Sequence, residues 1–193
     1  YVYRGATRGT LVGVNILSQH YSVPLDPKVI MNRNPQVFRG QSHVNASIFY
    51  LYPWRNYHFF GEGAWAKSGG KATVMGVVTS LSQYIDGTLL LRHYDQNFHG
   101  PFGKGFKESS EKGNERGIYL GTKISPMRRL HLNAYYDHFY FPWSYGKPST
   151  GYSCLVKVTY QPMRSALGYF QYKITTKNRY IPQNKRVNTS SVL

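Results

Sequence analysis

The sequence predicts an all-β protein, an antiparallel up-and-down transmembrane β-barrel of which about nine strands are present. Three observations predict it. Apolar and polar residues alternate along most of the chain, the connections between these segments alternate in length, and aromatic residues gather where the segments end. The composition agrees, because 16% aromatic residues, with 18 tyrosines and 19 glycines, suit pleated strands and their turns. No run of about 18 apolar residues is present, which excludes an α-helical membrane span.

The clearest alternation lies in residues 129–141. One face carries Leu130, Leu132, Ala134 and Tyr136, and the opposite face carries His131, Asn133, Tyr135 and Asp137. Three residues of the second face are too polar for hydrocarbon, so that face is expected to look into a polar interior. We therefore predict that Leu130 and Leu132 face lipid and that His131, Asn133 and Asp137 face the lumen.

The same pattern recurs in eight other segments. In residues 151–161, Val156 and Val158 are expected to face lipid and Lys157 the lumen. The remaining predicted strands are 10–20, 41–51, 55–66, 72–82, 86–95, 117–125 and 165–177. The two central segments, around 74–78 and 89–91, are apolar on both faces, which predicts packing against a plug, a partner or a separate core.

The connections form two groups. Those at 52–55, 82–86, 125–128 and 161–165 are short, whereas 21–40, 98–116 and 142–150 are long and rich in Gly, Pro, Asn and Ser. The connection at 67–71 belongs by its position to the second group but is short. Outer-membrane barrels have short periplasmic turns and longer loops outside the cell, so this alternation predicts the orientation of the chain.

Aromatic residues mark both ends of the predicted strands. We predict that Trp54, Tyr84 and Tyr160, with Tyr52, lie at one headgroup level and that Trp65 and Trp143 lie at the other, with Tyr94, Phe141 and Tyr145. Core and loop aromatics of a soluble β protein are the alternative.

Nine is an odd number, whereas bacterial single-chain outer-membrane barrels use an even number of strands. We therefore expect residues 1–178 to be a segment of a larger barrel and residues 179–193 to be a polar loop or disordered end.

The net charge of +16 predicts attraction to anions. It leaves three uses open: a lumen that favours anions, contact with acidic lipid headgroups, and binding of nucleic acid. Basic residues stand beside aromatic ones at Trp54 and Arg55 and at Tyr172 and Lys173. Such pairs suit single-stranded nucleic acid and membrane interfaces alike, and we favour the interface.

No catalytic, cofactor or metal site is predicted. His131 and Asp137, with His58, Glu62 and Lys157, are better explained as a polar network of the lumen than as acid and base groups. Ser47 and His58 are weak candidates for a hydrolase pair, since both are assigned to the interior. The acidic residues Asp95, Glu108, Glu111 and Glu115 lack the spacing of a calcium loop, and the single Cys154 excludes a disulfide framework.

Four stretches carry a resemblance to a known family. They are 52–62 (YPWRNYHFFGE), 107–121 (KESSEKGNERGIYLG), 132–143 (LNAYYDHFYFPW) and 151–162 (GYSCLVKVTYQP). Their order and spacing resemble those of Bacteroidota outer-membrane proteins named for an N-terminal helix-hairpin-helix region, which is followed by a large β-barrel. The resemblance covers most of residues 1–178 and contains no counterpart of the helix-hairpin-helix region.

The resemblance and the pattern together predict a non-enzymatic protein of the bacterial outer membrane, with a structural or transport role, alone or as a subunit of a larger envelope complex. The expected partners are outer-membrane lipid and other outer-membrane proteins. The alternative is a component that binds nucleic acid or takes up DNA, which the family name implies and the charge supports weakly.

Overall fold

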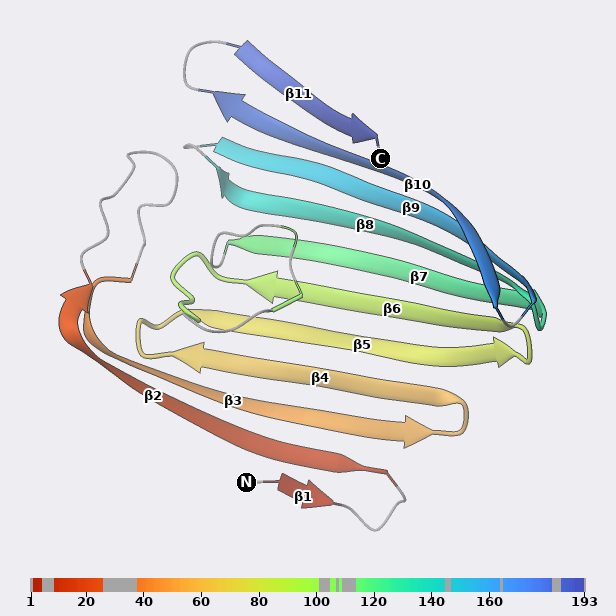
Figure 1. The fold of residues 1–193 in the computed structure, drawn as a ribbon. Helices are drawn as coiled ribbons and strands as arrows, with labels where there is room; N and C mark the ends of the chain where they lie inside the picture. The colour runs from red at the N-terminus through yellow and green to blue at the C-terminus, as the bar shows by residue number, and fades with distance from the viewer. Residues whose placement is uncertain are drawn as a thin grey trace.

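The chain forms a single antiparallel sheet in which every strand pairs with its neighbours in sequence, in the order β1 to β11 (Figure 1). This computed structural model describes residues 2–4, 9–25, 38–100, 105–106, 108, 114–144, 147–163, 165–181 and 185–192. No helix among these residues is long and apolar enough to cross a membrane.

The strands are long. Their bounds are β1 Val2–Arg4, β2 Leu11–Leu25, β3 Gly40–Trp54, β4 Tyr57–Ala66, β5 Lys71–Ser82, β6 Ile85–Tyr94, β7 Glu115–Met127, β8 Leu130–Ser144, β9 Lys147–Met163, β10 Ala166–Ile181 and β11 Lys185–Val192. The nine predicted strands correspond to β2 through β10, which confirms the all-β, antiparallel, up-and-down fold.

The structure differs from the predictions at three places. β11 occupies much of the segment that was expected to be a polar loop or disordered end, and β10 continues past residue 178 to Ile181. The connection expected at 142–150 is short, because β8 and β9 extend toward each other until Ser144 pairs with Lys147. The acidic residue Glu115, which was assigned to a loop, is the first residue of β7.

The tight turns follow from residues with a left-handed backbone. Arg55 has a φ of 54° between β3 and β4, where its guanidinium lies 5.3 Å from the centre of the Trp54 ring. Gly69 has a φ of 82° between β4 and β5, a conformation that glycine adopts without steric cost. There the N–H of Gly69 donates to the carbonyl of Ala66 at 2.9 Å, which closes the turn.

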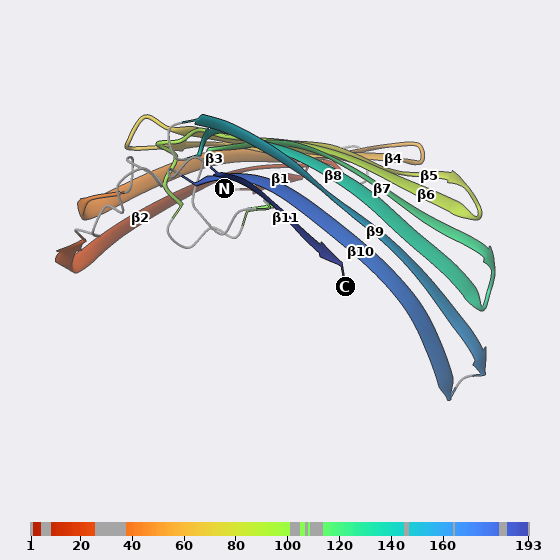
Figure 2. The same ribbon diagram turned by 90° about the horizontal axis from the view of Figure 1, so that it is seen from above.

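The sheet is arched and open (Figure 2). Over the described strands β1 and β11 are its two edges and do not pair with each other. The described parts of the connection between β6 and β7 lie on the concave side, as the green segments in Figure 2 show.

Pairing across the strands divides the side chains into two faces of opposite character. On the convex face one row crosses eight strands, and we call it the apolar row; it contains Tyr52, Phe59, Val77, Leu89, Leu120, Tyr136, Cys154 and Ile174. The adjacent row on the concave face contains Leu51, Phe60, Gly76, Leu90, Tyr119, Asp137, Ser153 and Thr175. Because strand side chains alternate, Arg92, Lys123 and Asp137 lie on the concave side, whereas Lys71 and Arg116, at the starts of their strands, lie on the convex side.

Candidate functional site

The connection between β6 and β7 is folded onto the concave face and is held there at its beginning and end. At its base the N–H of Asn114 donates to the carbonyl of Asp95 at 3.1 Å. Farther along, the carbonyl of His99 accepts hydrogen bonds from His43 Nε2 at 2.6 Å and from Asn45 Nδ2 at 2.9 Å. His43 and His99 are both buried. The connection therefore reaches across the sheet from β6 to β3.

The turn between β4 and β5 provides a second anchor. Ser68 Oγ donates to the carbonyl of Asn97 at 2.6 Å, and Asn97 Nδ2 donates back to the carbonyl of Ser68 at 3.3 Å. A Cβ on Gly70 would lie 2.3 Å from the backbone nitrogen of Phe98. This glycine is thus required for the close approach of the two backbones.

Asp95 fixes the start of the connection. Burial raises the pKa of its carboxyl group, but hydrogen bonds from His93 and from the backbone N–H of Lys71 outweigh this effect and hold that pKa below its usual value. The two bonds measure 2.9 Å each. The connection consequently leaves β6 in a defined direction.

A buried ion-pair triad lies beneath the connection. Arg92 Nε donates to Glu115 Oε1 at 2.7 Å, and its two terminal nitrogens donate to the two carboxylate oxygens of Asp137 at 2.7 and 3.1 Å. The side chains of Arg92 and Glu115 are fully buried, and that of Asp137 is 8% exposed. The triad joins β6, β7 and β8 at adjacent positions on the concave face.

Glu115 also holds the connection itself. Its two carboxylate oxygens accept hydrogen bonds from the backbone N–H of Glu108 at 2.9 and 3.1 Å. The side chain of Glu108 in turn forms an ion pair with Lys177 of β10 at 2.7 Å. A chain of charged contacts therefore extends from β6 through the connection to β10.

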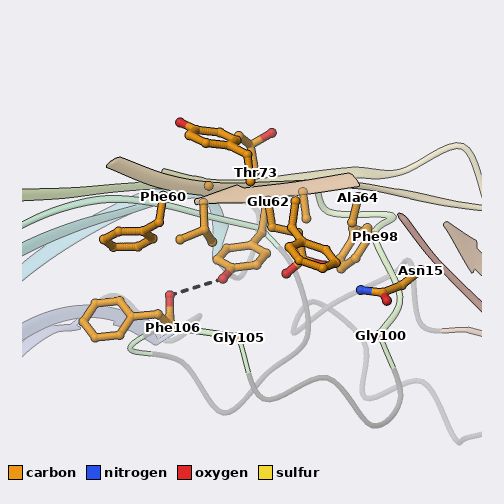
Figure 3. Close-up of a pocket in the computed structure, with 15 residues that line it drawn as sticks. Asn15, Phe60, Glu62, Ala64, Thr73, Phe98, Gly100, Gly105 and Phe106 are labelled. Carbon is orange, nitrogen blue, oxygen red and sulfur yellow. Dashed lines mark hydrogen bonds between the residues drawn. The ribbon is translucent and has the colours of Figure 1, made fainter. Parts of the chain in front are cut away.

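Aromatic contacts complete this attachment. The Arg92 guanidinium lies 5.4 Å from the centre of the Phe106 ring, and that ring packs edge-on against Tyr119 at 5.2 Å. Tyr94 Oη donates to the carbonyl of Phe106 at 3.3 Å, the contact drawn as a dashed line in Figure 3. Phe106 thus attaches the connection to the sheet through Arg92, Tyr94 and Tyr119, in addition to the contacts of Asn97, His99 and Glu108.

A cavity of about 700 Å³ lies between the connection and the sheet. Figure 3 shows Phe60, Glu62 and Ala64 of β4 on one side and Gly100, Gly105 and Phe106 of the connection across from them. Ala72 and Val74 of β5 also line it. The sequence left open what covers the apolar inner side of the central strands, and over this part of the sheet the cover is the chain's own connection.

Gly117 makes room for the triad, because a Cβ there would lie 2.4 Å from Arg92 Cζ. We expect Gly117→Ala to lower the free energy of unfolding by about 1 to 3 kcal/mol, since it forces the buried guanidinium out of place. Gly87→Ala is the matched control, because its new methyl would make only ordinary van der Waals contacts, with Leu81 Cδ1 at 3.6 Å and Thr79 Cγ2 at 3.8 Å. Chemical unfolding of the protein measures both, and equal losses would contradict this role of Gly117.

The structure brings the predicted inward residues onto one face and the predicted outward residues onto the other. The concave positions include His131, Asn133, Asp137 and Lys157, and the convex positions include Leu130, Leu132, Val156 and Val158. Among the predicted interface aromatics, Trp54, Trp65 and Tyr160 are exposed on the convex face, Tyr84 is exposed in the turn between β5 and β6, and Trp143 is exposed at the end of β8.

Some aromatic residues lie elsewhere than expected. Tyr94 is buried on the concave face, where it contacts the connection, and Phe141 packs against Phe139 on that face. Tyr145 lies outside the described residues. Tyr172 and Lys173 point to opposite faces of β10, so they do not form an aromatic and basic pair.

The fold does not bring together the two residue pairs that were considered for catalysis. Ser47 and His58 share the concave face, but Ser47 pairs with Ala64, six positions along β4 from His58, a separation of about 20 Å. His131 and Asp137 are equally far apart within β8; His131 Nδ1 contacts Ser125 Oγ at 2.9 Å, whereas Asp137 binds Arg92.

The acidic residues of the connection are also separate. Asp95 pairs with His93, Glu108 with Lys177 and Glu115 with Arg92, and Glu111 lies outside the described residues. Among the described residues, no group of three or more His, Cys, Asp and Glu side chains is placed to hold a metal ion.

The sequence interpretation missed Arg92, Glu115 and Phe106 as a unit. Arg92 comes directly after the apolar run Leu89–Leu91. A charge next to such a run was the available signal, because a buried arginine requires carboxylate partners. Asp137 was predicted to share a face with His131 and Asn133, as it does, but its partner could be identified only from the pairing of β6, β7 and β8.

No family model, curated protein or solved structure matches this chain.

Proposed function

We propose that this chain is a segment of a bacterial outer-membrane β-barrel with a structural or transport role, whose convex face contacts lipid and whose concave face lines the interior. The observation that carries the proposal is the apolar row. It runs across eight neighbouring strands and contains no Lys, Arg, Asp or Glu. The next row toward the short turns is free of these residues as well; it contains Trp54, Tyr57, Thr79, Gly87, Thr122, Ala134, Val156 and Tyr172.

The exposure of these side chains supports lipid contact. Leu120 is 47% exposed, Met75 44% and Val156 43%, and they lie on three different strands of the convex face. Soluble proteins seldom expose a continuous apolar surface of this extent, because its contact with water is unfavourable. Hydrocarbon removes that cost.

The lengths and ends of the strands fit a membrane. Tyr57 and Trp65 lie on the convex face near the two ends of β4, which has 10 residues. A tilted membrane strand needs about 9 to 11 residues, and amphipathic rings are favoured at both headgroup levels. The charged or polar residues of the convex face near Trp65 lie at the end of the sheet that carries the long connections. They are Lys71, His93 and Arg116.

The concave face has the character of a barrel interior. Its charged residues include Arg92, Glu115 and Asp137, which satisfy one another, and the connection between β6 and β7 crosses it. In a closed barrel this connection would narrow the interior near the end opposite the short turns. That arrangement suits a restricted channel or a closed structural barrel.

The family resemblance agrees with this proposal and supplies the outer membrane as the location. For the nucleic-acid alternative, one contact remains in favour, the Arg55 guanidinium over the Trp54 ring. The same contact suits a headgroup level equally well, and the second expected pair is not formed because Tyr172 and Lys173 lie on opposite faces. We therefore propose the structural or transport role of a membrane barrel and not nucleic-acid binding.

Spin labels on neighbouring residues of β9 test the proposal. Cys154 belongs to the apolar row, and Leu155 points to the concave face. In the full-length protein in lipid vesicles, a label on Cys154 is expected to collide mainly with lipid-soluble oxygen. A label on Leu155→Cys, in a Cys154→Ser background with other thiols replaced, is expected to collide mainly with a water-soluble nickel complex. The same preference at both positions would reject lipid contact of the convex face alone.

A further inference from the structure

The concave face carries a second group of charges, toward the short turns and away from the triad. We propose that it binds anions of the phosphate class. The group consists of Lys123 of β7, Lys157 of β9 and Lys173 of β10, and we call it the basic strip. The inference rests on the proposed function in one respect, namely that the concave face lines the interior.

Strand pairing places the basic strip in a compact arrangement. Lys123 pairs with Asn133, Asn133 pairs with Lys157, and Lys157 pairs with Gln171, so these side chains form one row. Two strand spacings separate Lys123 from Lys157, or about 10 Å between Cα atoms. Their flexible side chains can therefore approach the same anion above Asn133.

Lys173 adds a third charge beside this row. It pairs with Leu155, two positions along β9 from Lys157, and therefore lies on the same face. The ammonium group of Lys157 lies 4.6 Å from the centre of the Tyr169 ring, which keeps it on the concave side. The amides of Asn133 and Gln171 can donate hydrogen bonds to an oxyanion between the lysines.

The charges of the basic strip are not neutralised within the described part of the chain, where none of the three lysines forms an ion pair. Asp86 lies opposite Lys123 across the strands and reduces the positive charge at that end of the basic strip, but it forms no ion pair with Lys123; its Oδ1 accepts a hydrogen bond from Ser80 Oγ at 2.7 Å. Arg92, in contrast, is bound by two carboxylates.

Electrostatics favours an anion at this place. Three cations close together on an inner surface repel one another, and a field between low-dielectric walls concentrates counterions. Lipid headgroups are not the expected ligand, since the basic strip lies opposite the apolar convex face. A phosphate-class solute or substituent fits its charge and its hydrogen-bond donors.

Titration of inorganic pyrophosphate into the full-length protein in detergent micelles tests the inference by calorimetry. The variant K123Q/K157Q/K173Q is expected to bind pyrophosphate at least about tenfold more weakly, because three nearby charges are lost. The control R55Q/R128Q/R129Q changes the net charge equally in two turns and is expected to alter the affinity by about twofold or less.

Absence of pyrophosphate binding to the unmodified protein, or equal losses in the two variants, would overturn the inference. Insertion into vesicles is measured separately on the same preparations. A protein that inserts without binding pyrophosphate rejects the anion site alone. A protein that binds pyrophosphate through the basic strip but does not insert supports the site and rejects the proposed barrel.

Discussion

Replacement of Arg92 by methionine is expected to lower the free energy of unfolding by about 3 to 5 kcal/mol, because it leaves two buried carboxylates without their cation. Glu115 is fully buried, and Asp137 is nearly so. Methionine keeps much of the aliphatic volume, so the loss reports on charge more than on packing. Chemical unfolding of the full-length protein in lipid vesicles gives the value.

The matched control removes all three charges together. In the variant R92M/E115Q/D137N no carboxylate is left unpaired, and we expect it to regain most of the stability that Arg92→Met loses. Arg92→Lys tests the geometry, since an ammonium group cannot make both the single bond to Glu115 and the two-oxygen contact with Asp137. A loss of less than 1 kcal/mol for Arg92→Met, or additive effects of the three single replacements, would show that the triad does not act as a unit.

The same triad is expected to govern the connection between β6 and β7. Glu115 accepts the backbone N–H of Glu108, and Arg92 lies against Phe106. Loss of the arginine therefore removes a contact on the sheet side and takes the Arg92 charge away from Glu115 beneath the connection. Faster hydrogen exchange at the amide of Glu108 in Arg92→Met is the corresponding local change.

The division of the side chains between two faces could be predicted from sequence because it depends only on the period of two along a strand. Once Leu132 and Asn133 are assigned to opposite faces, residues 130–141 of β8 follow, up to the register shift between Phe141 and Ser144. The same holds for Val156 and Lys157 in β9. Regular antiparallel pairing then extends the assignment from strand to strand. This is why the four predicted inward residues and the four predicted outward residues lie on opposite faces of the sheet, and which face contacts lipid stays a prediction.

The triad could not be predicted in this way, because its members come from three strands and their meeting depends on register. Arg92 pairs with Gly117, two positions from Glu115, and Asp137 lies one row away opposite Tyr119. A shift of one residue in either pairing would send the partners to opposite faces. The sequence alone does not fix the register of β7, since the connection that precedes it is long.

The inward course of that connection was also beyond the sequence. Its composition of Gly, Pro and charged residues is typical of any exposed loop. The contacts that hold it belong to residues far away in the chain, such as His43 and Lys177. The apolar inner side of β5 and β6 was the one indication that something covers these strands.

An arginine in place of Leu120 is expected to destabilise the folded protein in membranes by about 2 to 4 kcal/mol, because it places a charge in the middle of the apolar convex face. Leu120 lies near the middle of β7 and is 47% exposed. The position is more informative than Leu132, which lies only two residues from the start of β8. A charge near the end of a strand can reach the headgroups, so Leu132→Arg is expected to cost about 1 kcal/mol or less.

The difference between the two variants distinguishes lipid contact from ordinary packing. In detergent micelles and in vesicles both proteins are unfolded with urea, and the ratio of their losses is compared. If the convex face contacts hydrocarbon, Leu120→Arg loses more than Leu132→Arg because the cost of a charge depends on its depth. If the convex face were exposed to water instead, Leu120→Arg and Leu132→Arg would each lower the free energy of unfolding by only about 0.5 kcal/mol. That result would reject lipid contact of the convex face, and the antiparallel sheet would still stand.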